Sequence, residues 1–269
     1  QDGGFEGKDI TRILELAQEN SFEFKNDGKV TSVEYLKCYA EHISNLIKKG
    51  TGLEKPFEGM KIAVDAGNGS GGFYADLVLK PLGADTSGSK FLEPDGNFPN
   101  HIPNPEDASA MEAISSAVIE SSSDLGLIFD TDVDRAAIVD ETGKSINKNR
   151  LIALIAAVLM EEKKGTVVTD SVTSAGLKTF IEGIGGVHHR FKRGYKNVIN
   201  EAKKIMAEGG YAPLAIETSG HAALSENYFL DDGAYLVTRL LIKAVNMKKE
   251  GKKLTSLIAS LKDPKISKG

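Results

Sequence analysis

From about residue 60 onward, short apolar runs alternate with stretches of helical periodicity. The runs MKIAVD at 60–65 and LGLIFD at 125–130 have the length of buried strands, whereas residues 108–121 and 148–162 show helical spacing. Alternation of this kind is typical of β-α-β units around a largely parallel sheet. We therefore predict an α/β fold for this part of the chain.

The same plan then occurs a second time. Residues 165–186, GTVVTDSVTSAGLKTFIEGIGG, parallel the stretch that begins MKIAVDAGNGSGG: a strand, a turn of small residues, a helix and a glycine-bearing exit. YAPLAIETSGHAAL at 211–224 occupies the place that LGLIFDTDVDRAAI at 125–138 holds in the first half. The pattern predicts two tandem, related α/β domains with mostly parallel sheets, over residues 54–150 and 151–269.

The N-terminal 53 residues have a different pattern of apolar and polar positions. Residues 8–20 and 31–48 both show the apolar spacing of amphipathic helices, and no strand pattern accompanies them. In the second helix the predicted apolar face consists of Val33, Leu36, Tyr39, Ala40, Ile43 and Ile47. We interpret residues 1–53 as the helical C-terminal remnant of a preceding domain.

Composition narrows the class of protein. Hydrophobic residues make up 41% and charged residues 26% of the chain, with a net charge of −5, and these values give no case for a nucleic-acid or membrane partner. The longest apolar run, LIALIAAVLM at 151–160, is too short to span a bilayer. The single cysteine, Cys38, allows no internal disulfide, which favours a reducing compartment, and we expect a buried thiol.

The candidate chemistry begins where the strand at 125–129 ends. FDTDVDR places Asp130, Asp132 and Asp134 at every second position, with Arg135 directly after them. Three carboxylates this close repel one another unless a cation holds them, so they are candidate ligands of a hard metal ion.

Three other interpretations of this aspartate run fit less well. A solvated turn does not need three alternating acids after a buried strand. A calcium loop of the EF-hand type would use Glu141 as its last ligand, but it requires glycine where Arg135 stands and helices where the flanks read as strands. The aspartyl-phosphate phosphatase motif shares D-x-D but normally carries Thr or Val where Asp134 stands. A magnesium loop for phosphoryl transfer accounts for more, because Arg135 can neutralise a phosphate.

A second polar cluster, ETSGH, lies at the equivalent strand end of the second half. Glu217 and Ser219 can accept from or donate to hydroxyl groups, Gly220 permits close backbone approach, and His221 adds a further donor. Ligands bind at the carboxyl ends of strands in open α/β sheets, so the position of ETSGH, equivalent to that of the aspartate run, makes it a second candidate ligand site.

Other polar features favour structural roles. For the glycine-rich turn at 67–72 strand-to-helix packing is preferred over a phosphate cradle, and His101 is expected to play a supporting role in its loop. His188 and His189 have no further ligand at zinc spacing. The basic run at 190–193 is equally well interpreted as facing phosphate or as a solvated loop.

An ordered set of motifs, which extends over about residues 55–240, resembles the α-D-phosphohexomutase family. The motifs are AVDAGNGSGG, PDGNFPNHIPNPE, FDTDVDR, RGYKNV and ETSGH. That family includes phosphoglucomutases, phosphomannomutases and phosphoglucosamine mutases. For the first half the resemblance implies that Asp130, Asp132 and Asp134 bind Mg²⁺ and that Arg135 is a catalytic residue beside the active-site phosphate. For the second half it implies that the substrate-binding residues are Glu217, Ser219, His221, Gly194, Tyr195 and Lys196.

The resemblance also implies an activity. In this family four domains surround one cleft, and a phosphoserine in domain 1 donates its phosphoryl group to a hexose monophosphate. The resulting hexose bisphosphate returns the other phosphate, so hexose 1-phosphate and hexose 6-phosphate interconvert. We expect an isomerase of carbohydrate metabolism, an intramolecular phosphotransferase and phosphoprotein. The alternative is a non-catalytic sugar-phosphate or cation-binding protein of the same fold.

The chain also departs from the family pattern. It has no T-A-S-H-N-P-like serine loop and no R-x-S-G-T-E-P-like phosphate loop after ETSGH. We expect residues 54–150 to be domain 2, residues 151–269 to be domain 3, and domains 1 and 4 of the same parent chain to be missing, so the isolated chain should be inactive.

Two further properties stay open. SGH resembles the phosphomannomutases and phosphoglucosamine mutases, whereas VTSAGL and GYK resemble the phosphoglucomutases, so the sugar is not decided. An intracellular location is expected, in the cytoplasm or, as the alternative, in an organelle stroma such as the plastid.

Overall fold

The computed structural model describes residue 5, residues 7–20, residue 22 and residues 28–262, and the chain divides into two compact units, residues 1–36 and 37–269. The first unit contains the predicted helix α1 (Gly7–Glu19), on which Ile10, Ile13 and Leu14 are exposed. The second predicted helix is α2 (Tyr35–Thr51), which begins four residues later than predicted.

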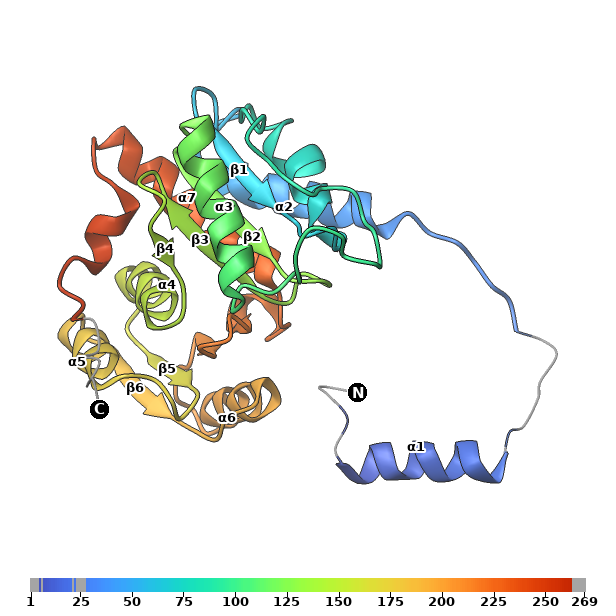
Figure 1. Ribbon diagram of the computed structural model, residues 1–269. Helices are drawn as coiled ribbons and strands as arrows, with labels where there is room; N and C mark the ends of the chain where they lie inside the picture. The colour runs from blue at the N-terminus through green and yellow to red at the C-terminus, as the bar shows by residue number, and fades with distance from the viewer. Residues whose placement is uncertain (1–4, 6, 21, 23–27, 263–269) are drawn as a thin grey trace, which may run out of the picture. The chain divides into compact units, whose positions relative to one another are not determined.

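The first sheet has four strands in the order β1 (Ile62–Asp65), β2 (Leu125–Phe129), β3 (Ala136–Asp140) and β4 (Ser145–Ile146). Strand β1 pairs parallel with β2, whereas the β2–β3 and β3–β4 pairs are antiparallel. Helix α3 (Ala108–Ser121) lies on one face of this sheet, and α2 and α7 (Gly233–Lys249) lie on the other (Figure 1).

The second sheet repeats this arrangement in the order β6 (Val187–Arg190), β5 (Thr166–Thr169), β7 (Leu214–Ile216) and β8 (Ala222–Leu224). Here β5 pairs parallel with both β6 and β7, and β7 pairs antiparallel with β8. Strands β5, β7 and β8 therefore correspond to β1, β2 and β3. In the first half the place of β6 is taken by residues 85–90, which form isolated bridges from Asp85 to Lys61, just before β1, and from Lys90 to Asp65, at the end of β1. The predicted tandem α/β architecture is confirmed, but the sheets are mixed and the first is not mostly parallel as predicted. Short loops join β2 to β3 and β3 to β4, and such loops permit only antiparallel pairing.

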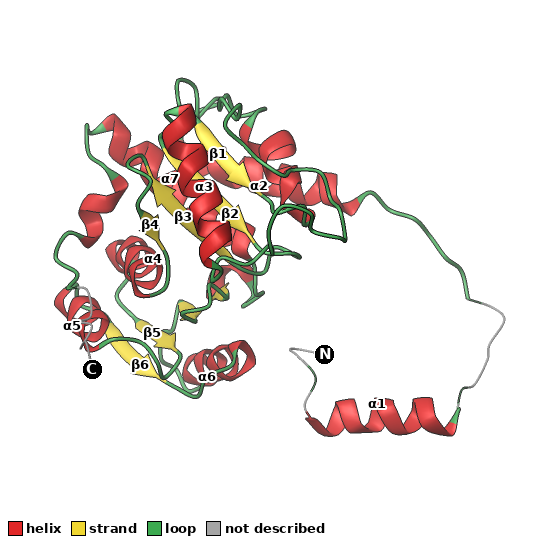
Figure 2. Ribbon diagram, in the orientation of Figure 1, coloured by secondary structure: helices red, strands yellow, loops and turns green. Residues whose placement is uncertain are grey.

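Helices and short helical turns connect several of the strands, whereas loops and turns join β2 to β3, β3 to β4 and β7 to β8 (Figure 2). The remaining elements are η1 (Ser70–Gly72), the π-helix η2 (Tyr74–Leu79), α4 (Asn149–Glu162), α5 (Ala175–Gly183), α6 (Tyr195–Ala207), η3 (Ser225–Asn227) and η4 (Leu254–Ile258). Side-chain caps explain three of the helix starts: Asp107 caps α3, Ser174 caps α5 and Asp232 caps α7.

One hydrophobic cluster runs through both halves. Alternate residues of the first sheet point to opposite faces: Ile128 points to α3, and Leu127 points away from it. The residues that point away from α3 belong to the same cluster as Leu214 and Ile216 of the second sheet. Helix α4 is buried all round between residues 151 and 160, which explains its uninterrupted apolar sequence. Because the two sheets share this core, the carboxyl ends of β2 and β7 are held at fixed positions relative to each other.

Helix α2 contributes Ala40, Ile43 and Ile47 to the same cluster, so the predicted face is found in that part of the helix. The assignment of residues 1–53 to a preceding domain stays a prediction. Cys38 is exposed on α2, so the expected burial of its thiol is wrong; the residue lies off the apolar face. Among the helices of the described residues, none combines the length and hydropathy needed to cross a bilayer.

Candidate functional site

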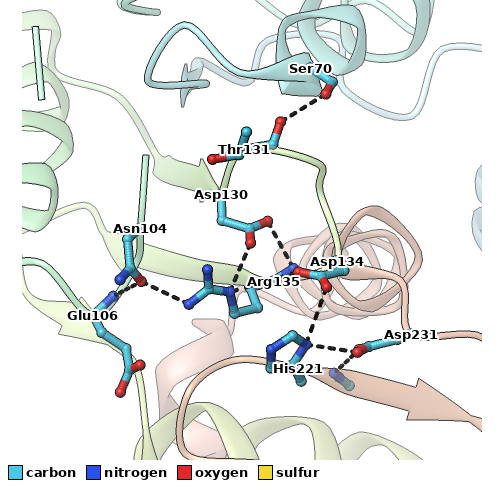
Figure 3. Close-up of polar contacts among 10 residues, drawn as sticks. Ser70, Asn104, Glu106, Asp130, Thr131, Asp134, Arg135, His221 and Asp231 are labelled. Carbon is cyan, nitrogen blue, oxygen red and sulfur yellow. Dashed lines mark hydrogen bonds and ion pairs between the residues drawn. The ribbon is translucent and has the colours of Figure 1, made fainter. Parts of the chain in front are cut away.

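The loop at 130–135 joins β2 to β3 and is folded around one ion pair. Asp130 is 1% exposed, and its two carboxylate oxygens accept hydrogen bonds from the backbone N–H of Arg135 (3.1 Å) and from its Nε (2.8 Å; Figure 3). The guanidinium also donates from Nη1 to Oδ1 of Asn104 at 3.0 Å. The loop therefore fixes the arginine that follows the aspartates in one orientation.

The three aspartates fit a divalent cation. One oxygen from each of Asp130, Asp132 and Asp134 lies within 4.8 Å of the others. Burial, followed by the hydrogen bond and charge of Asp130, raises the pKa of Asp134 to about 7. Oδ1 of Asp134 is buried and has no hydrogen-bond partner in the described part of the chain. That oxygen lies 3.7 Å from Nε of Arg135. A hard cation with oxygen ligands would relieve the repulsion and give this oxygen a direct ligand bond.

The loop at 217–221 follows β7 and is closed by its own backbone. The N–H of Glu217 donates to the carbonyl of His221 (2.9 Å), and the N–H of Gly220 donates to the carbonyl of Glu217 (3.1 Å). Gly220 has a φ of +102°, and an added Cβ would lie 3.0 Å from the carbonyl oxygen of Ala136, so this turn requires glycine. We call residues 217–221 the sugar loop and residues 130–135 the metal loop, after the roles that the resemblance implies for them.

Buried polar atoms line the sugar loop. Glu217 is 5% exposed; its Oε1 accepts from the N–H of Gly194 at 2.5 Å, and burial raises the pKa of its carboxyl group. The Oγ of Ser219 is buried without a hydrogen-bond partner among the described residues. A buried hydroxyl that has no protein partner is a ready position for a ligand hydroxyl.

The two loops meet. Arg135 and His221 form an antiparallel bridge, and Nδ1 of His221 lies 3.5 Å from Asp134 and 2.7 Å from Oδ2 of Asp231 (Figure 3). Burial lowers the pKa of His221, but the hydrogen bond and charge of Asp231 outweigh burial and leave that pKa raised. The ring of Tyr195 stacks on His221 with centroids 5.1 Å apart.

Nine of the ten predicted site residues therefore lie in the two loops or contact them. Gly194 and Tyr195, at the start of α6, contact Glu217 and His221, while Lys196 lies half-buried in the first turn of that helix. Asp132 is the exposed member of the metal loop. The roles given to these ten residues stay predictions.

Sequence reasoning missed three polar residues of this region. Asn104 binds Arg135, Asp231 binds His221, and Asp170 binds the backbone of the sugar loop. Asn104 lies within the quoted motif PDGNFPNHIPNPE. Asp231 precedes a helix cap in FLDDG, and Asp170 follows a strand. Nothing in either local sequence indicates a partner ten positions away, as His221 is from Asp231, or 48 positions away, as Thr218 is from Asp170.

The remaining candidates have structural partners. The N–H and hydroxyl of Ser70, in the glycine-rich turn, both donate to the carbonyl of Thr131, and an added Cβ on Gly69 would lie 2.7 Å from that oxygen. These contacts pack the turn against the metal loop, and the preference for strand-to-helix packing over a phosphate cradle stays a prediction. His101 contacts buried Asp65, and Arg190 donates to Thr173 and to the carbonyl of Ser174.

Most of the chain is similar in sequence to known proteins. The family models for the α/β/α domains II and III of phosphoglucomutase/phosphomannomutase match residues 37–143 and 147–263. The chain is 36% identical over 224 residues to a phosphomannomutase/phosphoglucomutase of Pseudomonas aeruginosa, covering 81% of this chain and 46% of that protein. It is 32% identical over 238 residues to a phosphoglucomutase of Neisseria gonorrhoeae, covering 87% and 49%.

A solved structure shows the same fold. The phosphoglucomutase/phosphomannomutase family protein of Burkholderia thailandensis superimposes with a TM-score of 0.80 at 27% identity, over 96% of this chain and 53% of the other. Tandem α/β domains with two facing polar loops thus define a phosphohexomutase-type fold. The chain belongs to the phosphoglucomutase/phosphomannomutase family. It spans about half the length of the curated relatives that it matches.

Proposed function

We propose that this chain supplies the metal loop and the sugar loop of a Mg²⁺-dependent phosphohexomutase, which interconverts hexose 1-phosphate and hexose 6-phosphate. The observation that carries the proposal is the contact between the two loops, through the Arg135–His221 bridge and the Asp134–His221 pair. A phosphoryl group and a sugar can be held side by side only if both sets of ligands converge.

Each loop has a defined chemical task in this proposal. Bound Mg²⁺ would be held by Asp130, Asp132 and Asp134 and would neutralise charge on the phosphoryl oxygens. Arg135 presents a planar set of N–H donors that matches a phosphate. Glu217 and Ser219 bind sugar hydroxyls. Because the same site must accept the sugar in two orientations, a few hydroxyl contacts serve it better than a closely shaped pocket.

The proposed reaction consists of two successive phosphoryl transfers. The phosphoryl group leaves a phosphoserine, forms a bond to the free hydroxyl of a hexose monophosphate, and yields a hexose bisphosphate. The serine then recovers the other phosphoryl group of that bisphosphate. No serine loop of this kind occurs in the 269 residues. We therefore propose that the activity belongs to a longer protein, in an intracellular, reducing compartment, and that the isolated chain binds without converting.

A mutase assay on the full-length protein tests the proposal. Glucose 1-phosphate, mannose 1-phosphate and glucosamine 1-phosphate are each offered with Mg²⁺ and a trace of the matching bisphosphate. Conversion of at least one sugar phosphate is expected, and it should fall at least about tenfold in Glu217→Gln. No conversion, together with measurable binding of a sugar phosphate or Mg²⁺, would contradict the mutase and favour a binding protein of the same fold.

A further inference from the structure

We propose that Asp170 is a positioning residue: through Thr218 it fixes the sugar loop in the conformation that presents Glu217 and Ser219 to a hexose phosphate. This inference rests on the proposed function, since it takes the sugar loop as the part that binds substrate.

Asp170 is fully buried directly after β5, and three neutral donors satisfy it. Oδ1 accepts from the N–H of Val172 at 3.2 Å. Oδ2 accepts from both the N–H and the Oγ1 of Thr218, at 3.0 and 2.7 Å. A carboxylate removed from water at this depth is costly unless its hydrogen bonds are complete. Two of the three donors come from one residue of the sugar loop, which is thereby tied to the neighbouring strand.

Thr218, which donates both of these hydrogen bonds to Asp170, lies at the centre of the sugar loop. Thr218 is buried, and it stands between Glu217 and Ser219, the two residues assigned to the sugar hydroxyls. The loop's own backbone bonds join Glu217 to His221 and Gly220 but leave the N–H of Thr218 to Asp170. Loss of the tie would therefore free the middle of the loop while its ends stayed closed.

The first half contains an equivalent device, which supports the inference independently. Asp65 ends β1 as Asp170 follows β5, and its Oδ1 accepts from the N–H of Gly67, two residues on, at 2.8 Å. Both of its oxygens lie 3.1 Å from Nε2 of His101. His101 belongs to the loop that carries Asn104, which in turn holds Arg135. In each half a buried aspartate at the end of the first strand fastens a loop that leads to the site.

The test uses the 269-residue chain and four variants. Thr218→Val removes only the hydroxyl, Thr218→Ser retains it, and Asp170→Asn removes the charge. Thr142→Val is the matched control, because Oγ1 of Thr142 also donates to a buried aspartate, Asp140, at 2.6 Å, but in the β3–β4 turn. Amide hydrogen exchange of residues 217–221, the melting midpoint, and calorimetric binding of glucose 1-phosphate and mannose 1-phosphate are measured for each.

Thr218→Val should speed exchange in the sugar loop at least about tenfold, leave exchange in α7 unchanged, and weaken sugar-phosphate binding by a similar factor. Asp170→Asn should act in the same direction, and Thr218→Ser should stay within about twofold of the unaltered chain. Thr142→Val should change neither loop exchange nor binding.

Two results would overturn the inference: loop exchange in Thr218→Val within about twofold of the unaltered chain, or a loosened loop with undiminished binding. If the unaltered chain binds neither sugar phosphate, the proposed function loses its support, and the exchange result alone decides whether Asp170 fixes the loop. Should Asp170→Asn fail to fold, the comparison of Val with Ser at position 218 remains decisive.

Discussion

The metal loop and the sugar loop occupy the same position in two copies of one architecture, yet they carry different chemistry. Both connect the second strand of a parallel pair to an antiparallel neighbour, β2 to β3 and β7 to β8. The first has three carboxylates, one hydroxyl and an arginine; the second has one carboxylate, two hydroxyls and a histidine. The repeated scaffold places the two loops, and a handful of side chains at the strand ends decides what each of them binds.

The buried aspartates at the ends of the first strands, Asp65 and Asp170, also differ between the two halves. Asp65 is paired with a histidine, whereas Asp170 is satisfied by a backbone amide and a hydroxyl of Thr218. The halves also share one core, so their stabilities should not be separable. Four experiments bear on this comparison.

The largest effect is expected in the shared core. Ile155 is fully buried in α4, and Ile155→Ala should cost about 2–5 kcal/mol of unfolding free energy because it leaves a cavity. Urea unfolding followed by hydrogen exchange should show the loss equally in β2 and β7. Ile119→Ala, at a 60% exposed position on α3, is the control and should change stability by less than about 0.5 kcal/mol. A loss confined to the second half would show that the halves are independent.

Mg²⁺ should stabilise the chain. At a concentration one hundred times its dissociation constant, a ligand of the native state adds about 2.7 kcal/mol. The increase in melting midpoint should be greater at pH 8 than at pH 5.5, because the pKa of Asp134 is raised to about 7 and bound metal needs the carboxylate deprotonated. Potassium chloride at equal ionic strength is the control. Equal shifts with both salts would remove the metal loop from consideration.

Asp132→Asn should distinguish the metal loop from an ordinary acidic turn. Asp132 is exposed, so its replacement should leave the fold intact while weakening Mg²⁺ binding at least about tenfold and abolishing turnover in the full-length protein. Asp76→Asn, which removes an exposed carboxylate paired with Lys80, should leave Mg²⁺ affinity unchanged. Calorimetric titration of both variants decides the point, and undiminished affinity in Asp132→Asn would refute its role as a ligand.

The smallest effect concerns a histidine of the second half. Burial, and then the charge of Arg190, lower the pKa of His188 to about 4, while Thr169 Oγ1 contacts its Nε2 at 2.8 Å. The unfolded chain binds a proton near the ordinary pKa of about 6.5. Stability is therefore full above pH 6.5 and falls as pH drops toward 4.

His188→Gln should flatten this part of the pH profile. After allowance for solvent screening, the difference between pH 7 and pH 5 should be smaller by about 1 kcal/mol in the variant. Urea unfolding at the two pH values measures it. An identical pH dependence in the variant and the unaltered chain would show that His188 is not responsible.

Much of the fold could be predicted because the local pattern agrees with the final structure. Helix α3 coincides with the predicted stretch 108–121, and α4 begins one residue after its predicted start, because periodicity and burial point the same way in both. Helix α2 was predicted to begin at residue 31, but it begins at Tyr35, and Val33 is 74% exposed. The apolar spacing therefore extends beyond the residues that form the helix.

The candidate site, like the fold, could be predicted from the sequence only in part. The sequence by itself determined the two tandem α/β halves, the carboxylate run at the end of one strand and the polar loop at the end of its counterpart, because these depend on local periodicity and on residues adjacent in the chain. Only the tertiary structure decided that the two loops touch, that His221 meets Asp134 and Asp231, and that Asp170 reaches Thr218. Those contacts join residues separated by up to 87 positions across a shared core, as Asp134 and His221 are, and a pairing at that distance depends on packing and leaves no trace in local sequence spacing.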